Sequence, residues 1–207
     1  MSNIILGDGA LGTELRSRGV QVPSQTESIW SALALTENPD EIKNIHLDYI
    51  EAGSDFMTIN NYAVTRPLLA RVGREDEIED LTLKSIELAE QAIKESDKDI
   101  MLAGSLPPLE TSYRADLIQD RESMLDQYAE IASILEGRVD IIICETMSCV
   151  LEAECALSCL EDSNSKVWLK IRKYSFSKVR TGLLMNGSDF LNSSFTHLSQ
   201  SSFVMKS

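Results

Sequence analysis

Apolar and polar positions divide this chain into two kinds of segment. Short apolar runs predict buried parallel strands, and longer stretches with apolar residues three or four positions apart predict helices. The apolar runs are 4–6, 56–59, 100–103, 141–143 and 166–169, and the helical stretches are about 39–53, 75–95, 121–137 and 150–160. Strands that alternate with helices pair in parallel through right-handed crossovers, so the predicted fold class is α/β.

Polar groups follow four of the five apolar runs. They are Gly7-Asp8-Gly9, Asn60-Asn61-Tyr62, Gly104-Ser105 and Cys144-Glu145-Thr146. A (β/α)8 TIM barrel builds its active site at the carboxyl ends of its strands, and a complete barrel has about 250 residues. The pattern therefore predicts a fold of the TIM-barrel type that is truncated after about five βα units.

The charge balance changes near residue 169. Residues 1–169 carry a net charge of −19, whereas residues 170–207 carry +5, contain nine serines and show no clear hydrophobic period. We expect a partial barrel domain over 1–169. Residues 170–207 are expected to form a divergent basic tail, either disordered or produced by an altered reading frame or splice pattern.

The overall composition excludes several classes of partner. The net charge of −14 argues against binding to nucleic acid or to an anionic membrane surface. No apolar run approaches the roughly 20 residues of a membrane span, and the start of the chain lacks the pattern of a secretory signal. These features predict a cytoplasmic protein.

All four cysteines (Cys144, Cys149, Cys155 and Cys159) lie within 16 residues. A disulfide framework would scatter its cysteines, and the spacing typical of zinc sites is absent. Residues four apart share a helix face, so Cys155 and Cys159 are expected to pack a helix as small apolar side chains.

The ordered set of motifs resembles the homocysteine S-methyltransferase family. The motifs lie within residues 4–169, in order and at family-like spacing. They are the stretches 6–15, 29–32, 46–55, 60–63, 103–108 and 144–147, followed by Glu152-Ala153.

This resemblance implies a (β/α) barrel that transfers a methyl group from a sulfonium-type donor, such as S-methylmethionine, to homocysteine and gives methionine. It also implies Zn²⁺ held by three cysteines, one after the sixth strand and an adjacent pair near the end of the barrel. This chain has no cysteine after Cys159. The sequence therefore assigns neither metal ligands nor a catalytic residue.

Four residues are the predicted contacts with the substrates. The resemblance implies that Asp8 and Glu145 hold the homocysteine ammonium and that Tyr62 faces the methyl donor. The backbone near Gly9 can approach a ligand closely and offer N–H groups to a carboxylate. Ordinary alternatives stay open: a turn at Asp8-Gly9, an acid in the first turn of a helix at Glu145, and simple packing at Tyr62.

Three further residues have weaker patterns. Trp30 is expected either to join the donor wall or to pack in the core. His46 lies on the apolar side of its helix and is interpreted as structural. Ser105 is interpreted as a loop serine rather than a substrate contact.

Two functions follow from these observations. The first is a homocysteine S-methyltransferase in methionine biosynthesis, acting on small-molecule substrates. The alternative is a catalytically inactive, truncated remnant or a homocysteine-binding module that lacks the zinc ligands. Unfinished sheet edges would also predict self-association.

Overall fold

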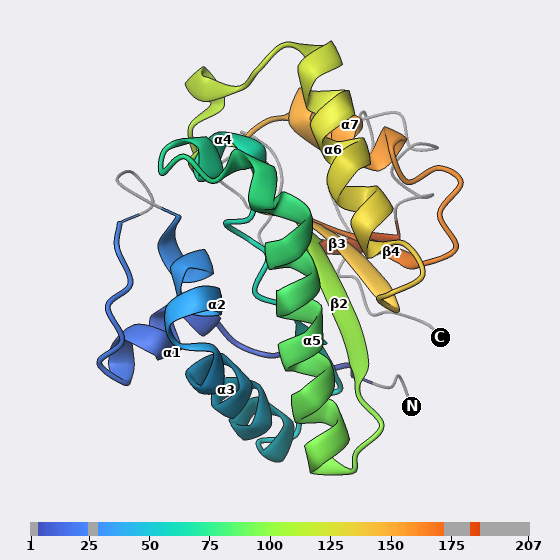
Figure 1. Ribbon diagram of the computed structural model, residues 1–207. Helices are drawn as coiled ribbons and strands as arrows, with labels where there is room; N and C mark the ends of the chain where they lie inside the picture. Colours follow the sequence, from blue (N-terminus) through green and yellow to red (C-terminus); the bar gives the residue numbers. More distant parts are fainter. Residues whose placement is uncertain (1–3, 25–28, 172–182, 187–207) are drawn as a thin grey trace.

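A five-stranded sheet forms the centre of the molecule (Figure 1). The computed structural model describes residues 4–24, 29–171 and 183–186. The strands of the sheet follow the order β1-β2-β3-β4-β5, in which β1 to β4 pair in parallel and β5 is antiparallel to β4. The α/β class with a parallel sheet is therefore confirmed. The strands are β1 Phe56–Thr58, β2 Met101–Leu106, β3 Ile141–Glu145, β4 Lys166–Ile171 and β5 Leu183–Asn186.

Helices cover one face of this sheet, with α5 and α6 in front of the strands in Figure 1 and α3 packed beside α5. Pro39 begins α3, where its missing N–H costs nothing. The α-helices are α1 Leu11–Ser17, α2 Ala34–Glu37, α3 Pro39–Glu51, α4 Arg66–Ala70, α5 Ile78–Ser96, α6 Arg121–Leu135 and α7 Val150–Ser158. Short 3-10 turns lie at Trp30–Leu33, Glu75–Glu77 and Ala115–Leu117. All four predicted helices are present, and the three short helices α1, α2 and α4 were not foreseen.

The first predicted strand, 4–6, is not a strand. Its neighbour Gly7 forms a single parallel bridge with Phe56, and the Leu6 carbonyl accepts from the Asp55 N–H at 2.7 Å. Ile4 is 85% exposed and Leu6 52%, so this run is not buried as its apolar character suggested. Among the described residues, β1 is the only strand beside this segment, so the side of the segment that faces away from β1 has no strand partner there. Self-association through such edges stays a prediction.

Two apolar layers lie on opposite faces of the sheet. The larger one packs the helices against the sheet, with Leu15, Leu106 and Tyr128 among its fully buried members. The smaller one lies on the other face and includes Phe56 of β1 and Trp168 of β4. These two rings meet edge to face with centroids 5.2 Å apart. Neighbouring strands are about 4.8 Å apart, so in a flat sheet β1 and β4 would be too far apart for their side chains to touch. The contact between Phe56 and Trp168 therefore shows that the sheet curves around this face, as the wall of a barrel does.

The cysteines behave as small apolar side chains. Cys144 and Cys155 are buried, and all four are free thiols. Cys155 and Cys159 face α6, where their sulfur atoms lie 4.0 and 3.3 Å from the carbonyl oxygens of Arg121 and Leu125. The predicted shared face is therefore present, and it packs against a neighbouring helix.

The segment after residue 169 is described only in part. Strand β4 continues through Ile171, two residues beyond the predicted end, and β5 lies within the expected tail. The sequence showed no period there because β5 has only four residues, too few for a pattern. The other residues of 172–207 lie outside the described residues, and the division at 169 stays a prediction.

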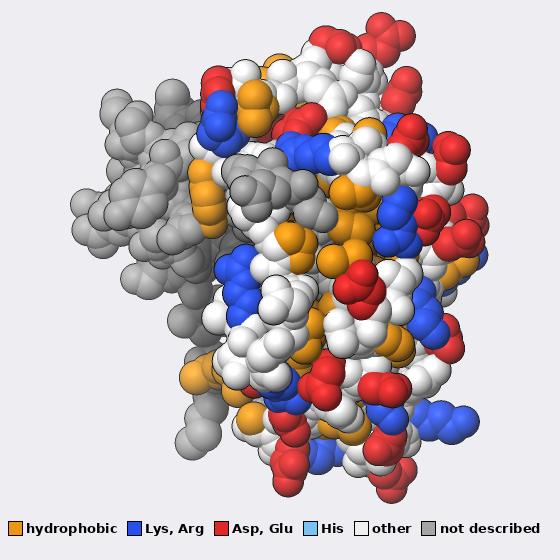
Figure 2. Space-filling model, turned by 60° about the vertical axis from the view of Figure 1, so that its left-hand side comes forward, with side chains coloured by type: hydrophobic (Ala, Val, Ile, Leu, Met, Phe, Trp, Pro, Cys, Tyr) orange, Lys and Arg blue, Asp and Glu red, His pale blue; other side chains and the backbone are white. Residues whose placement is uncertain are grey.

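Acidic side chains are spread over the face in Figure 2, with Lys and Arg side chains between them. Several charged side chains of the described residues form ion pairs, as in Lys43 with Glu95 at 2.9 Å. Within the described ranges, no helix is both long and apolar enough to cross a bilayer.

Candidate functional site

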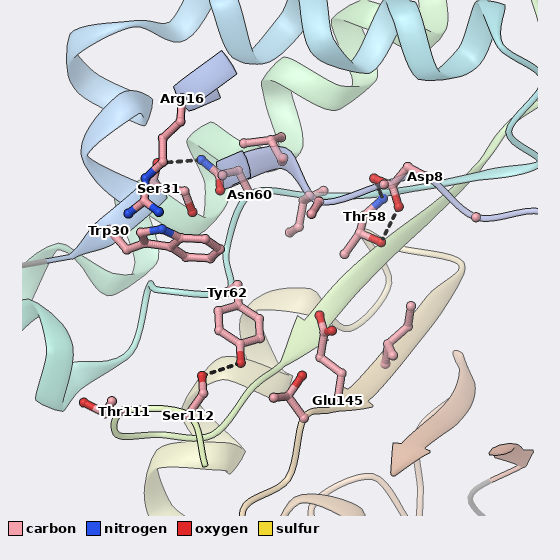
Figure 3. A pocket seen from close by; sticks show the side chains of 18 of the residues that line it. Asp8, Arg16, Trp30, Ser31, Thr58, Asn60, Tyr62, Thr111, Ser112 and Glu145 are labelled. Atoms are coloured by element: carbon pink, nitrogen blue, oxygen red, sulfur yellow. Dashed lines mark hydrogen bonds between the residues drawn. The ribbon is translucent and has the colours of Figure 1, made fainter. Parts of the chain in front are cut away.

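A cleft of about 1050 Å³ lies where the parallel strands end. It contains all four predicted substrate-binding residues: Asp8, Gly9, Tyr62 and Glu145. Trp30 lies there too, and Figure 3 shows the side chains of Asp8, Trp30, Tyr62 and Glu145 around the cavity. The remaining lining residues are Gly7, Ala10, Leu11, Gly12, Arg16, Ser24, Ser31, Phe56, Thr58, Ile59, Asn60, Thr111, Ser112, Tyr113, Ile143 and Thr146.

Asp8 is held by Thr58 of the neighbouring strand. One carboxylate oxygen accepts the Thr58 backbone N–H at 2.9 Å, and the other accepts the Thr58 hydroxyl at 3.0 Å. Burial raises the pKa of Asp8 to about 6 because it disfavours the charged form, and the negative charge of Glu145 raises it further. The two hydrogen bonds from Thr58 act in the opposite direction. The residue is therefore a fixed carboxylate that ionises close to neutral pH.

Glu145 ends β3 and is positioned by Ser105 of β2. The Ser105 hydroxyl donates to a Glu145 carboxylate oxygen, and the Ser105 N–H donates to Asn61 Oδ1 at 3.0 Å. Asn61 returns a hydrogen bond through Nδ2 to the Ser105 carbonyl at 2.8 Å. Ser105 is fully buried within a strand, so its interpretation as a loop serine is wrong. The apolar run at 100–103 ends before Ser105, which hid the last three residues of the strand.

Gly9 is exposed at the mouth of the cleft, and the Tyr49 ring of α3 lies against its backbone. A Cβ at Gly9 would lie 2.5 Å from the Tyr49 hydroxyl oxygen, which is inside the van der Waals contact distance. The glycine therefore lets the loop between Asp8 and α1 pass close to Tyr49.

Tyr62 and Trp30 form an aromatic wall. Their rings meet edge to face with centroids 5.9 Å apart. The Tyr62 hydroxyl lies 2.7 Å from the Ser112 hydroxyl, and burial raises the pKa of Tyr62 to about 12. The phenol is therefore neutral at physiological pH, and this wall presents aromatic surface to the cleft without a charge.

Strained backbone gathers at this cleft. Among the described residues, four other than glycine have a positive φ, and three of them line the cavity: Trp30 at 45°, Tyr113 at 65° and Thr146 at 59°. Such conformations persist where the surrounding structure enforces them, and they are concentrated at functional sites.

Sequence reasoning missed Arg16 and Thr58. Arg16 is four residues beyond Gly12 on α1, so the two share a helix face, and α1 itself had not been foreseen. Thr58 alternates with the buried Met57 and Ile59. This period of two marks the opposite face of β1 and is the signal that would have found it.

The thiols of this chain do not fit a metal site. Within the described ranges, no three His, Cys, Asp or Glu side chains gather closely enough to hold an ion, and no cysteine lines the cleft. Burial raises the pKa of Cys144, Cys155 and Cys159. These thiols are therefore neutral at physiological pH, whereas a metal ligand must be a thiolate.

His46 lies outside the cleft, fully buried on α3, in agreement with its structural interpretation. Neither ring nitrogen has a hydrogen-bond partner. Burial lowers the pKa of His46 to about 4, so the ring is neutral over the physiological range.

Comparison with known proteins points to one family. The family model described as homocysteine S-methyltransferase matches residues 5–201, beyond the span of the sequence motifs. The homocysteine S-methyltransferase of Escherichia coli (strain K12) is 32% identical over 167 residues, which cover 73% of this chain and 53% of that protein. Homocysteine S-methyltransferase YbgG of Bacillus subtilis (strain 168) is 27% identical over 176 residues, 77% of this chain and 55% of that protein.

A solved structure has the same fold. The metallated form of the homocysteine methyltransferase MmuM from Escherichia coli superimposes with a TM-score of 0.71 at 29% sequence identity. The match covers 82% of this chain and 63% of that one. The chain thus has the TIM-barrel type of fold, and it spans about half the length of the curated relatives that it matches.

Proposed function

The chain belongs to the homocysteine S-methyltransferase family, and we propose that its cleft binds homocysteine and a sulfonium methyl donor such as S-methylmethionine for methyl transfer to sulfur. The observation that carries this proposal is the meeting of Asp8 and Glu145, 137 positions apart in the sequence, in one cleft beside an aromatic wall.

The two carboxylates suit the ammonium of homocysteine. Asp8 is fixed by Thr58 and Glu145 by Ser105, so both are oriented before the substrate arrives. Each hydrogen bond between a carboxylate and an ammonium is assisted by charge and is stronger than a neutral one. The ammonium also relieves the repulsion between the two acids. The backbone of Gly9, exposed at the same end, is assigned to the substrate carboxylate.

The aromatic wall suits the donor. A sulfonium or quaternary ammonium group is attracted to the face of a tyrosine or tryptophan ring, by about 0.5–2 kcal/mol according to its desolvation. Tyr62 and Trp30 supply two such rings in the cleft that holds the carboxylates.

The reaction is a direct displacement. The sulfur of homocysteine forms a bond to the donor's methyl carbon as the bond from that carbon to the sulfonium sulfur breaks. The bonding pair stays on the departing sulfur, which becomes a neutral thioether, and the thiol proton passes to solvent. The residues assigned above position the two substrates, which accounts for much of the rate of such a transfer.

Zinc is the metal that the family resemblance implies for activating the thiol. Because the described residues do not fit a thiolate site, we assign this chain's residues only to binding and positioning. Without activation a thiol has a pKa near 8.5, and only a few per cent is thiolate at neutral pH.

Two measurements test the proposal. Titration calorimetry should show homocysteine binding that Asp8→Asn and Glu145→Gln each weaken by about tenfold or more. Asp116→Asn, a matched change at an exposed carboxylate outside the cleft, should have no effect. Mass spectrometry should detect labelled methionine formed from homocysteine and methyl-labelled S-methylmethionine with added Zn²⁺. Wild-type protein that is folded but binds no homocysteine would overturn the proposal.

A homocysteine-binding module is the second candidate. It is favoured by a cleft that holds the predicted substrate contacts without three metal-ligating side chains among the described residues. This candidate predicts homocysteine binding without methionine formation at high protein concentration. Tight stoichiometric binding of zinc that is lost on cysteine substitution would reject it.

A further inference from the structure

Among the described residues that line the cleft, Arg16 is the only one with a positively charged side chain. It lies near the end of α1, which forms one side of the cavity, and Figure 3 shows it extending toward Trp30 and Ser31 while Asp8 lies at the other end of the view. An independent contact agrees with this placement. Gly12 precedes Arg16 by one helical turn, and a Cβ at Gly12 would lie 2.5 Å from the Trp30 ring. The face of α1 that carries Arg16 is thus the face against which Trp30 packs.

The Arg16 guanidinium is oriented by backbone carbonyls. Its Nε and Nη2 donate to the Val22 carbonyl at 3.3 and 3.2 Å, and Nη2 also donates to the Pro23 carbonyl at 3.3 Å. These carbonyl oxygens fix the side chain without neutralising its positive charge. Among the described residues, no carboxylate forms an ion pair with Arg16, whereas its neighbour Arg18 pairs with Glu14 and Asp48.

The cleft is therefore electrically polar, with two carboxylates on one side, a guanidinium on the other and two aromatic rings in the same cavity. Resting on the function proposed above, we propose that Arg16 binds the carboxylate of the methyl donor and so selects zwitterionic donors. The donor's onium group then lies against Trp30 and Tyr62, and its methyl group faces the homocysteine held by Asp8 and Glu145.

The same charge rejects other ligands. A donor with an onium group but no carboxylate would place a second positive charge near the Arg16 guanidinium, which is unfavourable. Discrimination that combines an attractive contact with a repulsive one is the usual route to specificity. A planar guanidinium also matches the two oxygens of a carboxylate better than a lysine ammonium does.

The test pairs a change in the ligand with a change in the protein. Binding of S-methylmethionine and of its methyl ester, which lacks the negative charge, is measured by calorimetry without homocysteine, so that no turnover occurs. Wild-type protein should bind the acid about tenfold or more tightly than the ester. Arg16→Gln should abolish this preference, because the acid loses its attraction to the guanidinium and the ester is released from repulsion by it. Arg16→Lys should keep part of it, and Arg18→Gln, the matched control, should keep all of it.

Homocysteine binding by the same variants separates the two proposals. If wild-type protein binds no homocysteine, the proposed function fails and this inference fails with it. If homocysteine binds but the acid and the ester bind equally well, only the assignment of Arg16 is overturned. Loss of homocysteine affinity in Arg16→Gln without a change in donor affinity would also overturn it, because Arg16 would then serve the other substrate. A thermal transition within a few degrees of wild type qualifies each variant for the comparison.

Discussion

Thr58 holds both carboxylate oxygens of Asp8, one through its backbone N–H and the other through its hydroxyl. This relationship joins the loop at residues 7–9 to β1, and within the described residues the bridge from Gly7 to Phe56 is the only β-pairing between that loop and the strand. The proposed substrate contact and the anchor of the loop are therefore the same side chain, which has consequences for stability and for binding.

Asp8→Asn is expected to stabilise the fold at neutral pH. Burial raises the pKa of Asp8 to about 6 from 3.8, so the folded state binds the proton more tightly than the unfolded state. Stability from this group is complete below pH 3.8 and is lost as the pH rises through 6. The isosteric amide should therefore gain about 1–3 kcal/mol at pH 7 and nothing below pH 3.8. Urea unfolding at several pH values measures the difference, and equal stabilisation at pH 3.5 and pH 7 would contradict it.

Homocysteine affinity should fall as the solution is acidified through pH 6. The ammonium requires an ionised Asp8, and the carboxyl becomes protonated below its pKa of about 6. The dissociation constant should then rise by up to about tenfold for each further pH unit. Calorimetric titrations between pH 5 and pH 8 measure this slope. Asp8→Asn is the control, because it should bind weakly with a much flatter dependence on pH.

Ser105→Ala should weaken homocysteine binding without unfolding the protein. The substitution removes the hydroxyl that orients Glu145, while the backbone contacts between Ser105 and Asn61 remain. The expected loss is about threefold to tenfold, less than for removal of Glu145 itself, because water can replace the hydroxyl. Ser133→Ala removes an exposed hydroxyl that bonds a helix carbonyl, and it serves as the matched control. Equal affinities of the two variants would show that Ser105 does not position Glu145.

His46→Leu should reduce the sensitivity of the fold to acid. Burial lowers the pKa of His46 to about 4 from 6.5, so the unfolded state binds the proton more tightly. The wild-type protein should lose about 3 kcal/mol from this group as the pH falls from 6.5 to 4, opposite in sign to Asp8. The leucine variant should lack this component. It should be as stable as wild type or more so at pH 7, because both ring nitrogens of His46 are unpaired.

Chemical denaturation of the two proteins between pH 4 and pH 7 checks this expectation. A parallel fall in stability for His46→Leu and wild type would assign the acid sensitivity to other groups.

The sequence by itself determined the alternation of strands and helices, the acidic character of the chain and the family. These are local or additive properties: apolar runs bounded by polar groups mark β1 to β4, and the motifs near Asp8, Tyr62 and Glu145 lie at strand ends, which a parallel sheet brings to one edge. The same reasoning placed a strand at 4–6, where an apolar run has only one neighbouring strand to pair with.

Only the tertiary structure decided which groups meet. The bonds from Thr58 to Asp8 and from Ser105 to Glu145 span 50 and 40 positions. The position of Arg16 depends on a short helix that packs beside Trp30. The raised pKa of Asp8 and the lowered pKa of His46 follow from burial, which belongs to the packed chain and not to any segment of it. Contacts of this kind depend on how the sheet curves and how the loops close over its edge. The pattern of apolar and polar residues within one segment does not determine either of these.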